Sequence, residues 1–360
     1  MIKIIHWIPA ANLGGCEVLL STFLEGSIES ADHTILVGEE GPAIEMWMNK
    51  GVDSIRIVDF WWSRNPFKWA RNIKEILSGH DDFYFIAWSP SRLPFLRWAL
   101  GFTSFKGIIV HIGSLVSTPP IRNLLYRFID NLLRNKNKNI TLVACSDYVA
   151  KSVKVDSYYK KFESIGVLNG IRGVFFTHDV RRIGLNQWRF CTVSRLDAVK
   201  GHLGMIENIV SLHQKQSKVT FDIIGEGDMR GQLLSAISRY NSGDYVRLLG
   251  NRTEVIDLLD SHDFFIFNSQ SLEGMGIALA EAMSRGLICI VNDTPLMHEM
   301  LGECGLYFKT KEEFVNVLLS LSPSSLSDLS TKTRLRAKEM FEPHIFSKTY
   351  INLLEKNESC

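Results

Sequence analysis

The sequence of 360 residues has few cysteines and no CxxC pair, because its six cysteines are scattered along the chain. Isolated cysteines in apolar surroundings are usually buried free thiols, so a disulfide framework is not expected. The histidines do not cluster either, and His298-Glu299 lacks the second histidine of a zinc-binding helix. We therefore expect no metal site and no bound cofactor.

Long apolar runs and an excess of charge of one sign are also missing. Runs such as Gly107–Val110 are far shorter than the ~20 residues needed to span a bilayer. The amino terminus has neither the basic region nor the cleavage site of a signal peptide, so a cytoplasmic location is expected. The net charge of +1 gives no indication of nucleic acid as a partner.

Short β-rich runs alternate with amphipathic helical patterns over two stretches, which predicts parallel sheets covered by helices on both faces. A polar segment, Thr177–Arg189, separates them and is interpreted as a linker. The sequence thus predicts an α/β protein with two Rossmann-like, doubly wound domains, 1–175 and 176–340. A carboxyl-terminal helix, 341–360, is expected to pack back on the first domain. Open parallel sheets bind ligands at the carboxyl ends of their strands, so the site is expected in the cleft that the two domains face.

The expected strands are the most apolar runs of the chain. In the first domain they are Met1–Ile8, His33–Val37, Asp82–Ala87, Gly107–His111, Thr141–Cys145 and Glu163–Leu168. In the second domain they are Phe190–Val193, Thr220–Ile224, Tyr245–Leu248, Phe264–Phe267 and Leu287–Val291.

Two cations follow the expected strand Phe190–Val193. Arg195 and Lys200 lie in the loop at its carboxyl end. Arginine binds a diphosphate as a bidentate fork and lysine binds it as a point charge. Spacing alone fits two solvated surface charges equally well, so both interpretations stay open at this point.

The segment Ser269–Gly286 carries two glutamates, Glu273 and Glu281, on either side of a glycine-containing turn. Glycines disfavour a helix at the first glutamate, so we expect a helix to begin near Gly276-Ile277. The unpaired backbone N–H groups at that helix start would form an anion site, with the glutamates as hydroxyl acceptors beside it. A helix start with favourable acidic residues and no ligand is the structural alternative.

These motifs together resemble a retaining glycosyltransferase of family 4 (glycosyl transferases group 1), which has the two-domain GT-B fold. The resemblance covers nearly the whole chain and is strongest in the second half. It rests on "VSRLDAVKGH", "FDIIGEGDMR" and "SLEGMGIALAEAMSRG", together with "NLGGCEVLL" and "VHIGS" in the first half.

The resemblance implies a donor site for a nucleoside diphosphate sugar, expected to be UDP-linked. Arg195 and Lys200 would neutralise the pyrophosphate without a metal, Glu273 would hold hydroxyls of the transferred sugar, and Glu281 would bind the ribose. His111 would contact the sugar, although a lone histidine at a strand end is more often structural. The remaining donor-binding residues implied are Gly14, Gly15, Arg252, Gly274, Met275, Gly276, Ile277 and Ala278.

The implied activity is hexosyl transfer to a glycan or to a polyprenyl- or lipid-linked acceptor. Such a reaction would build a surface polysaccharide, a capsule, a lipopolysaccharide or another glycolipid. Two alternatives are a nucleotide-sugar 2-epimerase of the same fold and a catalytically silent GT-B subunit that stabilises a partner transferase. The retained Glu273/Glu281 and Arg195/Lys200 pairs favour transfer.

Basic and aromatic residues are concentrated in one part of the first half. From Phe60 to Lys138 the sequence has twelve Lys and Arg against four Asp and Glu, and five of the eight tryptophans lie there. This mixture suits an interfacial segment on an anionic membrane, so residues 60–106 are a candidate contact with the inner face of the plasma membrane. Packing of the aromatic side chains in the domain core is the alternative.

Overall fold

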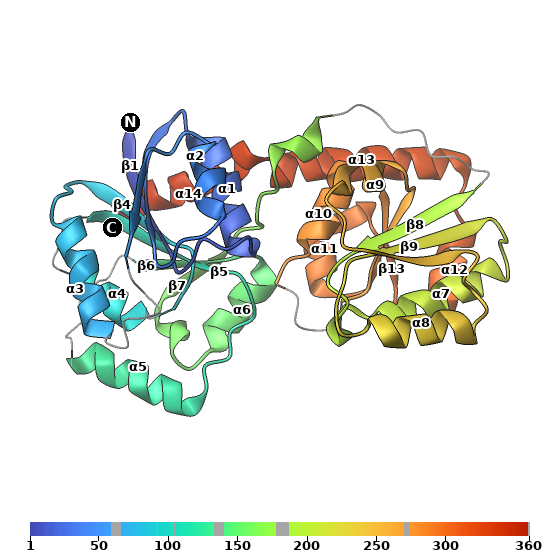
Figure 1. The fold of residues 1–360 in the computed structure, drawn as a ribbon, viewed down its shortest axis with the longest axis horizontal. Helices are drawn as coiled ribbons and strands as arrows, with labels where there is room; N and C mark the ends of the chain where they lie inside the picture. Colours follow the sequence, from blue (N-terminus) through green and yellow to red (C-terminus); the bar gives the residue numbers. More distant parts are fainter. Residues whose placement is uncertain are drawn as a thin grey trace. The chain divides into compact units, whose positions relative to one another are not determined.

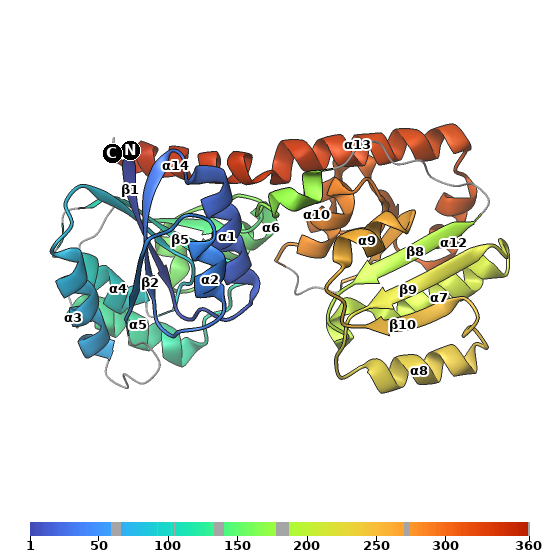
Figure 2. The same ribbon diagram turned by 45° about the horizontal axis from the view of Figure 1, so that its top comes forward.

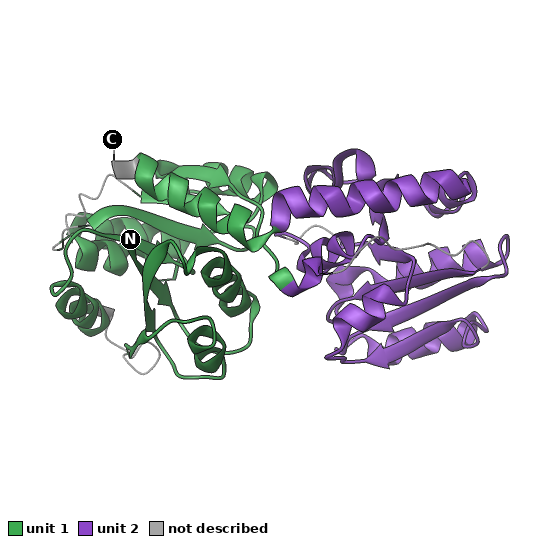
Figure 3. Cartoon of the chain, turned by 90° about the horizontal axis from the view of Figure 1, so that it is seen from above, with its two compact units in different colours: residues 1–173, 342–360 green, residues 174–341 purple. Residues whose placement is uncertain are grey.

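The computed structural model describes residues 1–58, 66–91, 93–101, 103, 105–132, 140–177, 187–269 and 274–358. The chain forms two compact units (Figure 3). The first unit comprises residues 1–173 and 342–360, and the second comprises residues 174–341. Each unit contains one sheet with helices on both of its faces (Figures 1 and 2).

The sheet of the first unit has seven parallel strands in the order β3-β2-β1-β4-β5-β6-β7. The chain reverses direction across the sheet between β1 and β4, which is the switch point of a doubly wound fold. The strands are β1 Ile2–Ile8, β2 Ala31–Val37, β3 Ser54–Ile57, β4 Phe83–Ala87, β5 Phe105–Ile112, β6 Ile140–Ala144 and β7 Glu163–Gly166.

Seven α-helices and a short 3-10 turn complete the described part of this unit. Ser146 caps α6, because its hydroxyl accepts a hydrogen bond from the Val149 N–H over 3.2 Å. The helices are α1 Gly15–Ser27, α2 Ala43–Met48, α3 Pro66–Leu77, α4 Leu93–Leu100, α5 Pro120–Leu132, α6 Asp147–Val155 and α14 Pro343–Glu358, and the turn η1 is Tyr159–Lys161.

The last helix, α14, packs on α1 and β5 of this first unit (Figure 1). Phe346, Tyr350 and Leu354 are the residues that it buries. The approach to α1 is so close that a Cβ atom on Gly26 would lie 2.1 Å from the Pro343 carbonyl oxygen. A glycine in α1 therefore makes this docking possible.

The sheet of the second unit has six parallel strands in the order β10-β9-β8-β11-β12-β13. Aromatic side chains fill the core on one face, where the rings of Phe190 and Phe264 stack with centroids 4.6 Å apart. The strands are β8 Trp188–Val193, β9 Val219–Ile224, β10 Val246–Gly250, β11 Phe264–Phe267, β12 Ile288–Asn292 and β13 Leu306–Phe308.

Helices cover both faces of this sheet (Figure 2). They are α7 His202–His213, α8 Arg230–Arg239, α9 Val255–Asp260, α10 Ile277–Ser284, α11 Pro295–Leu301, α12 Lys311–Leu319 and α13 Pro323–Phe341. Short 3-10 turns are η2 Gly173–Phe176, η3 Ala198–Lys200 and η4 Gly302–Cys304.

Two parallel, doubly wound sheets were predicted from the sequence, and both are confirmed. The strands β3 and β13 were missed, because β3 alternates apolar with polar residues and β13 is only three residues long. The predicted break at Pro343 separates α13 from α14. Of the expected linker, residues 178–186 lie outside the described residues. In the parts of the chain that the structure describes, none of the helices combines the length and the apolar character needed to cross a bilayer.

Candidate functional site

A pocket of about 540 Å³ lies in the second unit, where three neighbouring strands end. The segments after β8, β9 and β10 form one side of it, and the first turn of α10 forms another. Its lining residues are Val193, Ser194, Arg195, Ile224, Gly225, Glu226, Asn251, Arg252, Ile277, Ala278 and Glu281. This is the position at which open parallel sheets bind ligands.

Backbone hydrogen bonds hold the loops at the base of the pocket together. The Ser194 N–H donates to the Ile224 carbonyl over 3.1 Å, and the Leu196 N–H donates to the Glu226 carbonyl over 2.9 Å. The Gly225 N–H donates to the Gly250 carbonyl over 2.9 Å. The pairing of the strands thus continues past their ends and fixes the lining residues in place.

Two glycines after β9 make this close pairing possible. Gly225 and Gly227 have φ angles of 138° and 157°, which side chains disfavour. A Cβ atom would lie 1.9 Å from the Ser194 oxygen at Gly225, and 2.4 Å from the Leu196 oxygen at Gly227. The glycines therefore serve the contact between two loops, which accounts for them without a dinucleotide fingerprint.

The helix α10 presents its amino terminus to the pocket, since Ile277 and Ala278 are lining residues. Gly276 is its N-cap residue, and as a glycine it offers no side chain to cap the helix. The first N–H groups of any α-helix lack acceptors within the helix, and they lie at the positive end of its dipole. A Cβ atom on Gly276 would lie 2.8 Å from the ring of Phe267, so a glycine lets this helix start approach β11.

The two arginines that line the pocket form exposed ion pairs with neighbouring carboxylates. Arg195 has a side chain that is 79% exposed, and its Nε lies 3.0 Å from Asp197 Oδ2. Arg252 lies 3.4 Å from the Glu254 carboxylate. Exposed pairs of this kind contribute little to stability, so both guanidinium groups are available to an anionic ligand at small cost.

Some of the other residues predicted for the donor site are described but do not line the pocket, and one is not among the residues that the structure describes. Lys200 ends η3, and its Nζ lies 5.9 Å from the centre of the Phe267 ring. Gly274 and Met275 are buried just before α10 and do not line the pocket. Glu273 lies outside the described residues.

Gly14 and Gly15 lie in the first unit, at the start of α1. A Cβ atom on Gly14 would lie 2.6 Å from the Glu17 carboxylate, whereas on Gly15 it would meet nothing within 4 Å. The Glu17 carboxylate is the end of a flexible side chain that can move, so packing inside the unit does not require a glycine at either position.

His111 ends β5 and is buried, with 1% of its surface exposed. Its Nδ1 lies 2.8 Å from the Tyr350 hydroxyl of α14, and the Trp88 ring packs at a centroid distance of 5.7 Å. Burial lowers the pKa of this imidazole to about 4, so it is neutral at pH 7. These contacts join the last helix to the sheet, and the role toward a sugar stays a prediction.

Two of the three described tryptophans in the predicted membrane-contact stretch, 60–106, lie in the core of the first unit. Trp69 and Trp88 are fully buried and Trp98 is half-buried. Trp61 and Trp62 lie outside the described residues. Core packing, the alternative considered for these aromatic residues, therefore holds for Trp69 and Trp88.

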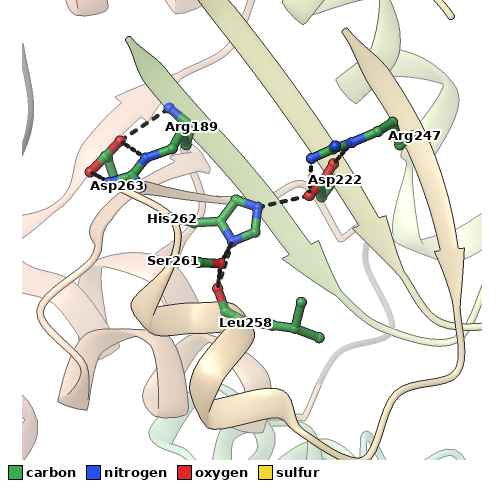
Figure 4. A network of polar contacts seen from close by, with 7 residues as sticks. All are labelled: Arg189, Asp222, Arg247, Leu258, Ser261, His262 and Asp263. Atoms are coloured by element: carbon green, nitrogen blue, oxygen red, sulfur yellow. Dashed lines mark hydrogen bonds and ion pairs between the residues drawn. The ribbon is translucent and has the colours of Figure 1, made fainter. Parts of the chain in front are cut away.

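A polar network that the sequence did not reveal crosslinks the strands of the second unit (Figure 4). Asp222 of β9 is held by two hydrogen bonds of 2.7 Å from Arg247 of β10 and by His262 at 3.1 Å. Burial of this carboxyl raises its pKa, but the hydrogen bonds from His262 and Arg247 outweigh burial and lower the pKa overall. Arg189 of β8 forms a bidentate ion pair of the same kind with Asp263, since its Nε and Nη2 donate to the two carboxylate oxygens.

Sequence reasoning also missed three residues of the pocket, Ser194, Glu226 and Asn251, as potential ligand contacts. The Ser194 hydroxyl lies 2.8 Å from His202 Nε2, and Glu226 pairs with Arg230 over 2.9 Å. These three residues follow the carboxyl ends of strands, as Arg195 and Arg252 do. That position in the sequence could have identified them as candidates for the same site.

Comparison with known proteins identifies the class of the second unit. Residues 175–339 match the model of the family described as Glycosyl transferases group 1. The resemblance seen in the motifs is thus confirmed for group 1 glycosyltransferases, and the narrower assignment to family 4 stays a prediction.

Two curated relatives align with parts of the chain. The GtfA subunit of the UDP-N-acetylglucosamine–peptide N-acetylglucosaminyltransferase of Limosilactobacillus reuteri is 36% identical over 104 residues, which are 29% of this chain and 20% of the relative. The amylovoran biosynthesis glycosyltransferase AmsK of Erwinia amylovora is 29% identical over 181 residues, 47% of this chain and 44% of the relative. The chain therefore spans less than half the length of either relative.

Among solved structures, Anabaena HepE in complex with UDP superimposes with a TM-score of 0.76 at 14% identity. The superposition covers 99% of this chain and 100% of HepE. At this identity the likeness shows the fold alone, and it confirms the GT-B class predicted from the sequence.

Proposed function

We propose that the protein is a retaining glycosyltransferase that takes a sugar from a nucleoside diphosphate sugar bound in the pocket of the second unit. One observation carries the proposal: two arginines, a helix amino terminus and Glu281 converge at the carboxyl ends of β8, β9 and β10. Cations and free N–H groups bind a diphosphate, and a carboxylate beside them accepts hydrogen bonds from hydroxyl groups.

The donor is a UDP-sugar in this proposal. GtfA is named for UDP-N-acetylglucosamine and the HepE structure is a complex with UDP, which supports this choice for a chain of similar fold. Arg252 follows β10 and reaches the nucleotide base, Glu281 binds the ribose hydroxyls, and Arg195 with Lys200 binds the pyrophosphate.

The reaction breaks the bond between the sugar's anomeric carbon and the diphosphate oxygen. Negative charge then grows on the leaving diphosphate, and the arginines and the α10 terminus stabilise it. The acceptor hydroxyl attacks the same face of the sugar and gives its proton to the leaving phosphate, so no protein nucleophile and no metal ion is required. Glu273 holds hydroxyls of the transferred sugar.

The acceptor in this proposal is a glycan or a polyprenyl- or lipid-linked sugar that becomes part of a surface polysaccharide. Support comes from the name of AmsK, which assigns that relative to amylovoran biosynthesis. The first unit, with Gly15 at the open start of α1, receives this acceptor.

A transfer assay tests the proposal. The full chain is incubated with a panel of UDP-sugars and oligosaccharide or polyprenyl phosphate sugar acceptors, with EDTA present, and the anomeric configuration of the product is read by NMR. We expect Glu281→Ala to reduce turnover at least tenfold, while Glu312→Ala, an exposed glutamate on α12, leaves it unchanged. Conversion of the donor to an epimer without transfer would instead identify a 2-epimerase, and EDTA-sensitive turnover would contradict the metal-independent mechanism.

A further inference from the structure

The helix α5 of the first unit carries its apolar face toward solvent. Figure 1 labels α5 at the edge of the first unit. Large apolar side chains exposed elsewhere on the described surface are mostly scattered, whereas five gather on this helix. They are Ile121 (84% exposed), Leu124 (72%), Leu125 (52%), Phe128 (62%) and Leu132 (60%). At about 100° per residue, they fill one arc of the helix surface roughly 100° wide.

The opposite face of α5 is fixed to the unit by polar contacts. Asp130 pairs with Arg97 of α4 over 2.7 Å and accepts a hydrogen bond from the Tyr158 hydroxyl over 3.0 Å. The Tyr126 ring packs on Tyr158 at 4.9 Å, and Ile129 is the apolar residue that the helix buries. The helix is therefore held with its apolar arc outward, which is the reverse of an ordinary surface helix.

Basic residues border the apolar arc on both sides. By helical position, Arg127 lies beyond Leu124 on one side and Arg122 lies beyond Leu125 on the other, and both arginines are exposed. Arg127 also donates a hydrogen bond to the Ser157 carbonyl over 3.1 Å. The only acidic residue of α5 is Asp130, which lies on the docked face.

We propose that α5 is the helix by which the protein binds an anionic lipid surface. An exposed apolar arc with arginines along its edges matches an interfacial helix, because the side chains enter the acyl boundary while the guanidinium groups reach the lipid phosphates. The charge of this face is complementary to anionic headgroups. The proposal is independent of the proposed function, and it assigns the membrane contact to residues 120–132 in place of the buried tryptophans Trp69 and Trp88.

A second copy of the chain fits this face less well. A two-fold contact through the same arcs would bring Arg122 and Arg127 of both copies together, and like charges at such a short range repel. A lipid surface instead supplies the opposite charge at both edges of the arc.

Vesicle co-sedimentation of the full chain tests the proposal without donor or turnover, so its outcome is separate from that of the proposed function. We expect binding to phosphatidylcholine vesicles that contain phosphatidylglycerol at about 0.05 M salt, weaker binding at about 0.5 M, and little binding to phosphatidylcholine alone. The double variant Leu124→Ser, Phe128→Ser should lower the partition coefficient at least about tenfold.

Matched variants control for folding and for exposed apolar area in general. The pair Leu234→Ser and Leu335→Ser removes equally exposed apolar side chains from the second unit and should bind as the wild type does. Arg122→Gln should weaken binding about fivefold. Wild-type protein that stays in solution with anionic vesicles, or a Leu124→Ser, Phe128→Ser variant that binds as tightly as the control, would overturn the proposal. So would a dimer that this variant dissociates in the absence of lipid.

Discussion

The two units share a doubly wound architecture, but they place their polar groups differently. The first unit seals neutral histidines among aromatic rings: His6 lies 2.9 Å from His33, and the Trp88 Nε1–H donates to His6 over 3.2 Å. The second unit instead crosslinks its strands with charged pairs, such as Asp222 with Arg247. It also keeps an open pocket at its strand ends.

This difference follows from what each unit does in our account. Neutral imidazoles inside an aromatic core allow α14 to dock on the sheet without a buried charge. Charged pairs on the sheet of the second unit join neighbouring strands, and a pocket at the carboxyl ends of those strands depends on their register. Acidification and single substitutions should therefore affect the stability of the two units differently.

The largest expected effect is an acid sensitivity of the first unit. Burial lowers the pKa of His33 and of His111 to about 4, and it lowers the pKa of His6 well below its ordinary value. Such groups bind protons in the unfolded state but not in the folded state, so the stability they contribute is complete above pH ~6.5 and is lost as the pH falls toward 4. For His33 and His111 the shift corresponds to about 3 kcal/mol each.

Among the described histidines of the second unit, His202 is the one whose pKa is lowered to about 4. Seven of the eight tryptophans lie in the sequence of the first unit, so urea unfolding followed by tryptophan fluorescence reports mainly on that unit. We expect its midpoint to fall steeply between pH 6.5 and 4.5, while hydrogen exchange shows a smaller change in the second unit. Equal loss of protection in both units would contradict the comparison.

Gly225→Ala should selectively lower the stability of the second unit. The new Cβ atom would lie 1.9 Å from the Ser194 oxygen at a backbone angle that side chains disfavour, so we expect a loss of about 3 kcal/mol or more. Gly231→Ala is the matched control, because a Cβ atom there meets nothing within 4 Å inside α8. It should be neutral or slightly stabilising. Hydrogen exchange in the second unit, measured for both variants, decides between these outcomes.

Asp222→Asn should have a smaller effect that depends on pH. The amide cannot replace the carboxylate toward both Arg247 and His262, and we expect a loss of about 2 kcal/mol at pH 7. The folded-state pKa of Asp222 is lowered, so its contribution is present above pH ~3.8 and is lost as the pH falls through the folded-state value. The difference between variant and wild type in urea denaturation should therefore shrink at low pH, and a constant difference would be evidence against the charged pair.

The sequence predicted those parts of the fold that are encoded by local patterns. Central strands such as β4 and β12 are continuous apolar runs, whereas the edge strand β3 is partly exposed and has no such run. The helix start at Ile277 was found because glycines exclude helix before it. In each case, residues close in the sequence determine the outcome.

Contacts between distant residues could not be predicted in this way. His111 meets Tyr350 across 239 positions, and nothing near either residue encodes the pairing. Likewise, Arg195, Arg252 and Glu281 could each be placed at a strand end or helix start, but only the folded unit brings them around one pocket. The outward face of α5 was missed for a related reason, since its orientation depends on the ion pair between Asp130 and Arg97.

Calorimetric titration of the full chain with UDP tests the central claim most directly, because it asks whether the pocket of the second unit holds a nucleoside diphosphate. We predict saturable binding, a dissociation constant raised at least about tenfold by Arg195→Ala combined with Arg252→Ala, and no change for Arg239→Ala, an exposed arginine on α8. Absence of UDP binding, or equal affinity in the double variant and the control, would contradict the account.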